Sequence, residues 1–251
     1  MRPLGALVPV VLLGAWEAAV WLGLLSARYF PPPTALAATF AHLIAGGVLW
    51  KEALVTLARL ATAFLLAAGP AVALGLAMGL WRPVRSAVEP YVALLYPLPK
   101  IALLPLLLIV LGVGEAAFIV TGAITAFFQI VLSTAGGVQS LDPRLIEVGR
   151  NYGARGVGLF RKIILPGALP AIFTGLRLGL GLALITVIVV EFVTAKSGLG
   201  HLVFRSWQML LTAEMFAAFV LIGLIGLALT RGLRLLQQRA LAWTPPERDL
   251  T

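Results

Sequence analysis

The sequence has no cysteine and only two histidines, His42 and His201. Without cysteine the chain can form no disulfide, no thiolate metal site and no thiol nucleophile. Two histidines give little basis for a histidine-based metal centre. We therefore expect neither a bound metal nor a cofactor.

Motifs for nucleotide binding and hydrolysis are also missing. A P-loop ends in Gly-Lys-Ser/Thr, but the one Lys-Ser/Thr pair, Lys196-Ser197, follows Ala195. The Gly-x-Ser-x-Gly turn of hydrolases fails at the same place, because Ala195 stands where its first glycine belongs. No His-Glu-x-x-His occurs either. We expect no enzymatic activity in this chain.

Charge is scarce, at 12% of residues against about 25% in soluble domains. The mean hydropathy is +1.02, and several apolar runs reach the roughly 20 residues that cross a bilayer. The pattern predicts an all-α polytopic membrane protein with about six transmembrane helices. The first run is too long for a typical signal peptide and is expected to be a retained span. The expected spans are 4–25, 56–80, 88–111, 115–138, 171–193 and 214–236.

The net charge of +9 comes from 19 Lys and Arg against 10 Asp and Glu. In a membrane chain this excess indicates cytoplasmic loops rather than nucleic-acid binding. Six spans put both termini on one side, and the basic residues favour the cytoplasm for the termini, the turn 81–87 and the loop 140–170. Twelve then lie inside: Arg2, Arg82, Arg85, Arg144, Arg150, Arg155, Arg161, Lys162, Arg231, Arg234, Arg239 and Arg248. Five lie outside or at the outer rim of the membrane: Arg28, Lys51, Arg59, Lys196 and Arg205.

The third span is interrupted by Pro97, Pro99 and Pro105, so its backbone must face protein or a wet cavity rather than lipid. Lys100 lies near its centre, and a charge at that depth indicates a functional site. Lys100 either lines a translocation pathway for an anionic solute or forms a structural ion pair with Glu17 or Glu191. Gln129 and Glu191 are weaker pathway candidates.

Two further local features are predicted. Pro31–Pro33 should stop any helix, and Thr34 should cap a short helix over residues 35–44. Glycines in the spans should allow neighbouring helices to approach closely. These are Gly75, Gly79, Gly175, Gly179 and Gly181.

Residues 142–170 form the one long polar passage in the middle of the chain and must lie in water. Asp142 should cap a helix that begins at Pro143 and runs to about Tyr152, with Gly153 as its left-handed stop. A second helix should cover about 157–164 and end because Leu165 precedes Pro166.

The first of these helices is amphipathic by helical spacing. Leu145, Val148 and Tyr152 share one face, while Arg144, Glu147 and Asn151 share the opposite face. Such a face either lies on lipid or docks into a protein groove.

The passage resembles the EAA motif of ABC-importer permease subunits, in which Glu-Ala-Ala, three residues, Gly, nine residues and Ile-x-Leu-Pro follow one another. Here the run from Glu147 to Gly153 and the run from Ile163 to Pro166 match its spacing. Residues 98–105 (LPKIALLP) and 197–200 (SGLG), with the prolines before Thr34, resemble the nitrate, sulfonate and taurine branch. The departure is Val148-Gly149 in place of two alanines, and its effect on helix packing is left open.

The resemblance covers essentially residues 1–251 and implies one permease domain of the type I ABC-importer (MetI-like) fold. It implies a transmembrane pathway for a small organic or anionic solute, built with a second permease copy, as a homodimer in the usual case of this branch. Two separate ATPase subunits would bind the ATP, and an extracytoplasmic solute-binding protein would deliver the solute. The chain would lie in the bacterial inner membrane. The resemblance assigns coupling to the ATPase to Glu147, Gly153, Ile163, Leu165 and Pro166.

Two other classes of protein remain open from the residues alone. A stand-alone secondary transporter or channel would explain the broken third span but not the spacing of the polar passage. A membrane assembly scaffold would transport nothing. The sequence does not name the solute.

Overall fold

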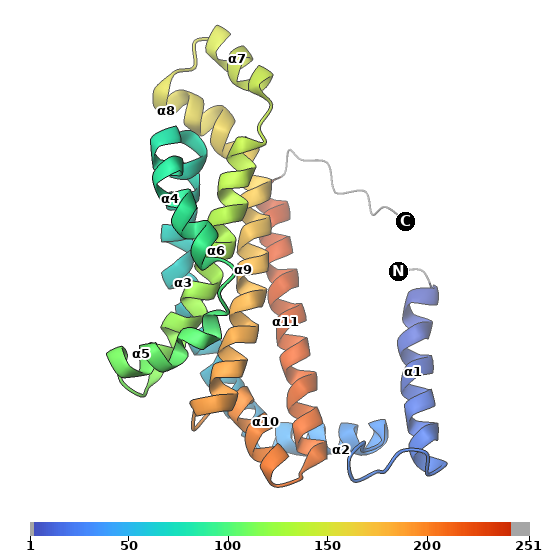
Figure 1. Ribbon diagram of the computed structural model, residues 1–251. Coiled ribbons are helices and arrows are strands. Elements are labelled where there is room, and N and C mark those ends of the chain that lie inside the picture. Colours follow the sequence, from blue (N-terminus) through green and yellow to red (C-terminus); the bar gives the residue numbers. More distant parts are fainter. Residues whose placement is uncertain (1–2, 242–251) are drawn as a thin grey trace. The chain divides into compact units, whose positions relative to one another are not determined.

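The computed structural model describes residues 3–241, with side chains from Leu7 onward. Within that range every regular element is a helix (Figure 1), which confirms the all-α prediction. The chain forms two compact units. Unit 1 holds the described residues up to Ala58 together with Ile188–Ile225, and unit 2 holds Arg59–Val187 together with the described residues from Gly226.

Unit 1 contains two complete helices at its start and one short helix, α10, near its end. Ends of three longer helices complete it: the start of α3, the end of α9 and the start of α11. Its core is apolar and includes Leu49, Leu199 and Leu202. The helix bounds are α1 (Pro3–Trp21), α2 (Pro33–Ala45), α3 (Val48–Leu80), α9 (Leu165–Thr194), α10 (Leu199–Gln208) and α11 (Thr212–Ala240).

Unit 2 contains the rest of the long helices and all of the polar passage. A cluster around Val138, Ile164 and Ala168 forms its core at the end next to that passage. Its complete elements are α4 (Arg82–Leu95), η1 (Lys100–Leu103), α5 (Leu104–Leu111), α6 (Glu115–Gln139), α7 (Pro143–Asn151), α8 (Gly156–Leu159) and η2 (Phe160–Ile164).

Among the described residues, four helices are long and apolar enough to cross a membrane: α3, α6, the continuous run Gly156–Thr194 and α11. The spans expected at 56–80, 115–138, 171–193 and 214–236 each lie inside one of them. The described apolar part of α1, Leu7–Trp21, is shorter.

The third expected span is a bent pair rather than a straight crossing. α4 and the run Lys100–Leu111 meet at 88°, and the break falls at Tyr96–Pro99. Two prolines within four residues remove backbone donors there and stop α4. The prediction of irregular backbone in this segment is therefore confirmed, whereas one continuous helix over 88–111 is not formed.

The segment 81–87, predicted as a turn, is the first part of α4. Pro83 stands in the first turn of this helix, where the missing proline N–H costs nothing. Arg85 donates from Nε to the carbonyl oxygen of Met78 and from Nη2 to that of Gly79, both at 3.0 Å. These bonds satisfy carbonyls at the end of α3, so one helix can follow the other directly.

The prediction that Thr34 caps α2 is also wrong. The helix begins at Pro33, and Thr34 lies inside it instead of before it. Glu17 of α1 supplies the cap: its carboxylate accepts the Thr34 N–H at 3.1 Å, the Thr34 hydroxyl at 2.8 Å and Trp21 Nε1 at 2.8 Å. The carboxylate within the first span is thus a structural partner.

Close helix contacts occur at four of the five predicted glycines. An added Cβ would lie 2.6 Å from Thr134 Cβ at Gly75 and 2.4 Å from Val138 Cβ at Gly79. Gly175 and Gly179 approach α6 in the same way, whereas no described atom lies within 4 Å of a Cβ at Gly181. Glycine at these positions sets the spacing of α3 and α9 from α6.

We expect Gly79→Ala to lower the stability of unit 2, because the added methyl group would overlap Val138. Overpacking of this kind costs about 1–3 kcal/mol. Thermal unfolding of the detergent-solubilised chain, followed by fluorescence-detected gel filtration, measures the loss. Gly69→Ala on the same helix meets no described atom within 4 Å and is the control. Equal losses in the two variants would contradict the assigned contact.

Candidate functional site

The polar passage folds largely as predicted in its first half. Asp142 caps α7 by accepting the Arg144 N–H at 2.9 Å, and Pro143 occupies the first helical position. Gly153 has a φ of +83°, the left-handed conformation that ends the helix after Tyr152. The Tyr152 and Gly153 N–H groups bond back to Val148 and Arg150. α7 is therefore closed at both ends by its own residues.

One side of α7 is anchored and the rest of it faces outward. Ile146 packs against the apolar cluster of unit 2, and Gly149 is buried. The predicted apolar face is exposed: Tyr152 retains 89% of its accessible surface, and Leu145 and Val148 each retain more than half. Val157 on α8 adds to it at 71%. This exposed apolar set, Leu145, Val148, Tyr152 and Val157, is called the α7 face below.

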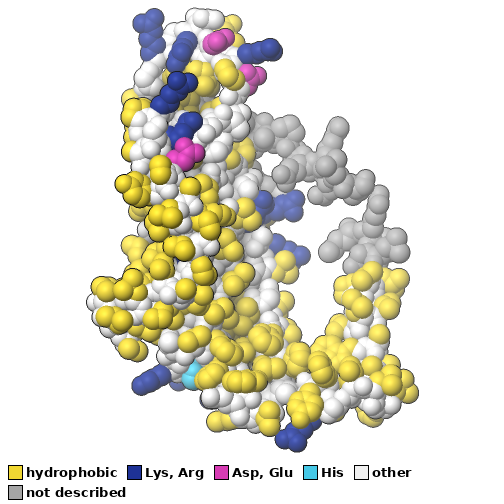
Figure 2. Space-filling model, in the orientation of Figure 1, with side chains coloured by type: hydrophobic (Ala, Val, Ile, Leu, Met, Phe, Trp, Pro, Cys, Tyr) yellow, Lys and Arg dark blue, Asp and Glu magenta, His cyan; other side chains and the backbone are white. Residues whose placement is uncertain are grey.

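Charged side chains surround the α7 face. Figure 2 shows Lys, Arg, Asp and Glu side chains gathered at the end of the molecule that carries α7 and α8, whereas the surface over α5 is mainly hydrophobic. A hollow of about 710 Å³ lies between α7 and the segment from α8 to η2. Its lining includes Leu145, Tyr152, Arg155 and Lys162. An apolar centre with a charged rim is the usual composition of a protein interface.

The second half of the passage differs from the prediction. α8 leads through one π turn, η2, directly into α9, so the run Gly156–Thr194 is continuous. Leu165 is helical, with φ −62° and ψ −49°, although Pro166 follows it. Hydrogen bonds in a π turn span five residues instead of four. The wider turn makes room for a proline that lacks an N–H, so the helix does not end at Leu165.

Gly149, the departure from the motif, has a packing reason. A Cβ at this position would lie 1.9 Å from Cδ1 of Ile163 and 3.3 Å from Cδ1 of Leu159. The missing side chain therefore lets η2 approach α7. This answers the question that the Val148-Gly149 pair left open: the first helix packs tightly because residue 149 is glycine.

The other residues predicted for coupling lie along the same path. Glu147 is exposed on α7, and Ile163 is half-buried beneath it. Leu165 and Pro166 begin α9. The chain thus connects the α7 face to a membrane-length helix through packed and continuous structure.

Lys100 begins η1, directly after the break between α4 and α5. Its ammonium donates to the carbonyl oxygens of Leu95, at 3.0 Å, and of Tyr96. It also lies 5.0 Å from the ring centroid of Phe128 and 5.2 Å from that of Tyr96. Its hydrogen bonds go to carbonyls at the end of α4, not to a carboxylate, contrary to the ion-pair alternative.

Gln129 lies beside this region on α6. Its side-chain oxygen accepts from the Tyr96 hydroxyl at 3.3 Å, and its Nε2 donates to the Ser133 hydroxyl at 3.3 Å. The two predicted pathway residues Lys100 and Gln129 therefore meet at Tyr96.

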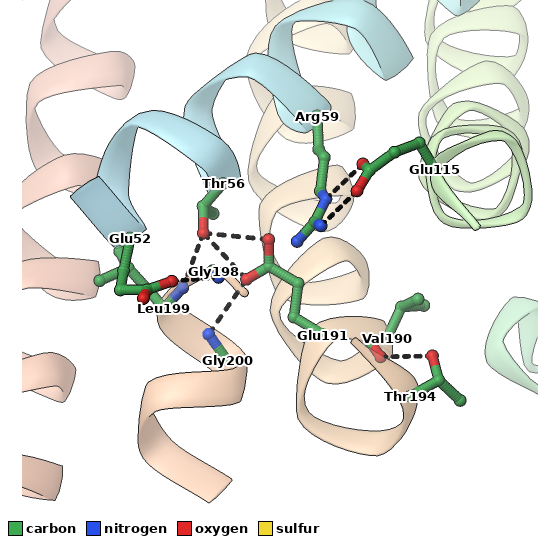
Figure 3. Close-up of polar contacts among 10 residues, drawn as sticks. All are labelled: Glu52, Thr56, Arg59, Glu115, Val190, Glu191, Thr194, Gly198, Leu199 and Gly200. Carbon is green, nitrogen blue, oxygen red and sulfur yellow. Dashed lines mark hydrogen bonds and ion pairs between the residues drawn. The ribbon is translucent and has the colours of Figure 1, made fainter. Parts of the chain in front are cut away.

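Glu191 is fully buried and lies in a separate polar network in unit 1 (Figure 3). Its carboxylate oxygens lie 2.9 and 3.0 Å from the Thr56 hydroxyl, and one of them accepts the Gly200 N–H at 3.0 Å. Thr56 accepts the Leu199 N–H at 2.9 Å, and Glu52 accepts the Gly198 N–H at 2.5 Å.

Three consecutive N–H groups at the start of α10 are thus satisfied by side chains. Such groups have no partner within their own helix. Gly198 has a φ of +107°, which favours glycine. A Cβ at Gly200 would lie 2.2 Å from the carbonyl oxygen of Ile188. The glycines of the SGLG segment therefore allow the backbone to come close enough for these hydrogen bonds. The burial of Glu191 and its bonds disfavour a pathway role for this residue.

A family model described as "Binding-protein-dependent transport system inner membrane component" matches residues 69–241. This range includes the bent span, the polar passage and η2. The chain belongs to this permease family. Permease function is therefore confirmed, and the secondary transporter, channel and scaffold alternatives are set aside.

Sequence similarity to other permeases extends over nearly the whole chain. A protein named for aliphatic sulfonates transport, SsuC of Bacillus subtilis (strain 168), is 31% identical over 95% of this chain and 87% of its own. The taurine transport system permease protein TauC of Escherichia coli (strain K12) is 34% identical over 93% and 86%.

The fold of a permease is shown independently by a solved structure described as an amino acid ABC transporter with histidines. One of its chains has a TM-score of 0.63 and 18% identity, covering 81% of this chain and 97% of that chain. The predicted type I permease fold is thereby confirmed.

Sequence reasoning missed Glu52, Thr56 and the Arg59–Glu115 pair of unit 2. Arg59 is almost fully buried and donates from Nε and Nη2 to the two Glu115 oxygens at 2.6 and 2.5 Å (Figure 3). Glu52, Thr56 and Arg59 are spaced four and three residues apart, which places them on one face of α3. Three polar residues on one face of an otherwise apolar helix were the sequence pattern that could have revealed these contacts.

We expect Gly149→Ala to set two effects against each other. Alanine is favoured over glycine in a helix by about 1 kcal/mol, but its methyl group would overlap Ile163. An Ile163→Val background lacks Cδ1 and so removes the severe overlap, leaving a contact of 3.3 Å with Leu159 Cδ1, and the gain should then predominate. A thermal-unfolding cycle over the four permease variants measures this coupling. Gly158→Ala, with no described atom within 4 Å, should stabilise in both backgrounds. Strict additivity at position 149 would rule out the proposed contact.

We expect Glu191→Gln to destabilise unit 1 by about 1–3 kcal/mol, because an amide NH₂ would replace one oxygen that accepts a hydrogen bond. Glu89→Gln, at an exposed position on α4, should change stability by less than about 0.5 kcal/mol. Differential scanning fluorimetry of both variants compares them. Wild-type stability in Glu191→Gln would contradict the cap assigned to this carboxylate.

Proposed function

We propose that this permease forms half of the pathway of an ATP-driven importer for small organic anions of the sulfonate class. We further propose that residues 142–166 couple it to a separate ATPase subunit. The observation that carries the coupling proposal is the α7 face. Leu145, Val148 and Tyr152 are exposed on or at the end of a helix that is capped at both ends, and Val157 of α8 extends this apolar set. Charged side chains surround it.

Burial in a groove of a partner protein explains this face best. An exposed apolar patch with a polar rim marks an interaction site in a stable fold. α7 needs no lipid for its own stability, because Asp142 and Gly153 close its ends and Ile146 anchors it. The ATPase is the partner that an ABC importer needs and that this chain, lacking a P-loop, does not contain.

The coupling residues then have distinct roles. Glu147 on the exposed part of α7 would meet basic groups of the ATPase, and Gly153 allows the chain to reverse after α7. Ile163 transmits displacement of α7 to η2 through the contact at Gly149. Leu165 and Pro166 pass it to α9, since the run from Gly156 to Thr194 is continuous. A stiff connection of this kind suits rigid-body switching.

The remaining partners follow from the family. Two copies of this chain would enclose the pathway, two ATPase subunits would bind to the two α7 faces, and an extracytoplasmic binding protein would deliver the solute. Trp81, Val157 and Phe160 line the same pocket, so Arg82 and Arg85 lie at the end of unit 2 that carries α7. Their positive charge supports a cytoplasmic position for that end. We also propose that both termini lie in the cytoplasm. Arg2 and Arg248, two of the twelve basic residues expected inside, lie outside the described residues.

A sulfonate-class solute is supported by the names of the two relatives and by Lys100. Lys100 and Gln129 are the pathway residues that we propose; Glu191 is retained only as a support of α10. An anion could exchange with the carbonyl groups for the Lys100 ammonium at the break in the third span.

We expect Tyr152→Asp to reduce copurification of the ATPase subunit by at least about tenfold. A charge would replace the most exposed aromatic residue of the α7 face, where burial on docking would make it costly. Affinity purification of the tagged permease with its co-expressed ATPase gives the readout. Asn151→Asp adds the same charge one residue away on the polar side and should retain the ATPase. Normal copurification with Tyr152→Asp, in a chain that still folds, would refute docking at this face.

A further inference from the structure

The hollow of about 710 Å³ beside α7 lies entirely within unit 2. Three members of the α7 face, Leu145, Val148 and Tyr152, form part of its lining. Gly153 and Gly158 also line it, and a Cβ at either position would meet no described atom within 4 Å. The missing side chains of these glycines leave space open. The hollow is thus continuous with the apolar surface at which we propose that the ATPase docks.

The side of the hollow that runs from α8 to η2 carries positive charge. Arg155 and Lys162 line it, and both side chains are exposed. In the described part of the chain neither of them takes part in an ion pair or a side-chain hydrogen bond. The described lining contains no Asp and no Glu. The two cations of the hollow therefore have no counter-charge from the chain that surrounds them.

The passage as a whole does not supply that counter-charge either. Residues 142–162 contain five basic residues and two acidic ones. One of the acidic residues, Asp142, accepts the Arg144 N–H as the cap of α7. The other, Glu147, is exposed on α7 and is not part of the lining.

Docking at the α7 face would seal this hollow. A flat partner surface would then enclose a space much larger than a water molecule, together with two cations removed from bulk water. An empty space forfeits packing contacts, and a buried charge without a partner is costly. A partner that binds tightly here must therefore fill the hollow and bring negative charge into it.

We propose that an acidic loop of the ATPase subunit inserts into this hollow. A carboxylate of that loop pairs with Arg155 and Lys162, and a large apolar side chain next to it packs against Leu145 and Tyr152. This inference rests on the proposed coupling function and adds to it the chemistry of the partner's surface. Docking is then reciprocal, because α7 enters a groove of the ATPase while a loop of the ATPase enters the permease.

A protein loop fits this place better than the headgroup of an anionic lipid. Glu147 is exposed on the same helix and would be repelled by an anionic membrane surface. A folded partner can instead place a basic group opposite Glu147 and an acidic group opposite Lys162. The exposed ring of Tyr152 also matches the aromatic residues that are enriched where two proteins meet.

The first test uses the amine of Lys162, which is the one lysine within residues 142–170. The full-length permease with its co-expressed ATPase in nanodiscs is treated with a water-soluble carbodiimide, which joins an amine directly to a carboxylate that contacts it. Peptide mapping by mass spectrometry identifies both ends of each crosslink. We expect a crosslink from Lys162 to an Asp or Glu of the ATPase. Lys162→Arg keeps the positive charge but has no amine and should abolish this crosslink.

The second test measures the Kd of the ATPase for the permease in nanodiscs by biolayer interferometry. Lys162→Gln should weaken binding by about thirtyfold or more, because a buried carboxylate loses one of its two partners. Lys162→Arg should recover most of this loss. Arg161→Gln removes the adjacent exposed charge, which lies outside the lining, and should weaken binding by at most about fivefold.

A third variant tests the space without changing any charge. Gly158→Leu places a side chain where a Cβ meets no described atom, so it should occupy the hollow and exclude the loop. Leucine is also favoured over glycine in a helix, so the variant should fold. We expect Gly158→Leu to weaken ATPase binding more than Gly158→Ala does, since a methyl group fills less of the space.

Several outcomes would overturn the proposal. A crosslink from Lys162 to a carboxylate of the permease or to phosphatidylserine, in place of the ATPase, would assign the counter-charge elsewhere. The absence of any crosslink from Lys162 in a complex that has formed would exclude the carboxylate pair. Equal losses of affinity in Lys162→Gln and Arg161→Gln would leave only a general attraction between charged surfaces.

Failure of this inference can be told apart from failure of the coupling function. If Tyr152→Asp loses the ATPase but Lys162 forms no crosslink, docking at the α7 face stands and the inserted loop is wrong. If Tyr152→Asp retains the ATPase, docking at the α7 face is itself refuted.

Discussion

Backbone N–H and C=O groups in apolar surroundings must find partners within the protein, and this constraint explains several polar residues of the apolar helices. Lys100 serves the carbonyls at the end of α4, and Glu17 serves the start of α2. Glu191, with Thr56 and Glu52, serves the start of α10. Each of these side chains hydrogen-bonds to the end of a helix. Charged residues of the apolar segments therefore serve helix ends at these places, whereas Arg59 is paired with Glu115.

The same constraint places the charged residues of the polar passage in water, where α7 is exposed to a partner. α7 is held by its cap, its left-handed stop and one buried side, while its apolar face stays exposed. The glycine at position 149 brings it against η2, and η2 continues into α9. In the proposed coupling, a force on α7 would thus reach one end of a membrane-length helix.

Helices and their capped ends could be predicted from the sequence where the signal is local. Apolar run length gave α3, α6 and α11, and Asp142, Pro143 and Gly153 gave α7. One prediction failed because a residue distant in the sequence decided the outcome: Glu17 caps α2 from another helix. Another failed because a π turn, which proline rules do not anticipate, carries the chain past Pro166. The ends of the motif could be found by spacing. The packing of Gly149 on Ile163 and the contact of Lys100 with Phe128 depend on tertiary distances, which no sequence pattern contains.

The most direct test of the coupling role of residues 142–166 is hydrogen–deuterium exchange of the permease with and without its ATPase subunit in nanodiscs. Docking on the α7 face should slow exchange in peptides covering α7 and α8, since water is excluded there. Peptides from α2 and α10 should be unaffected. Unchanged exchange over residues 143–159 in a complex that has formed, with protection elsewhere in the chain, would contradict that role.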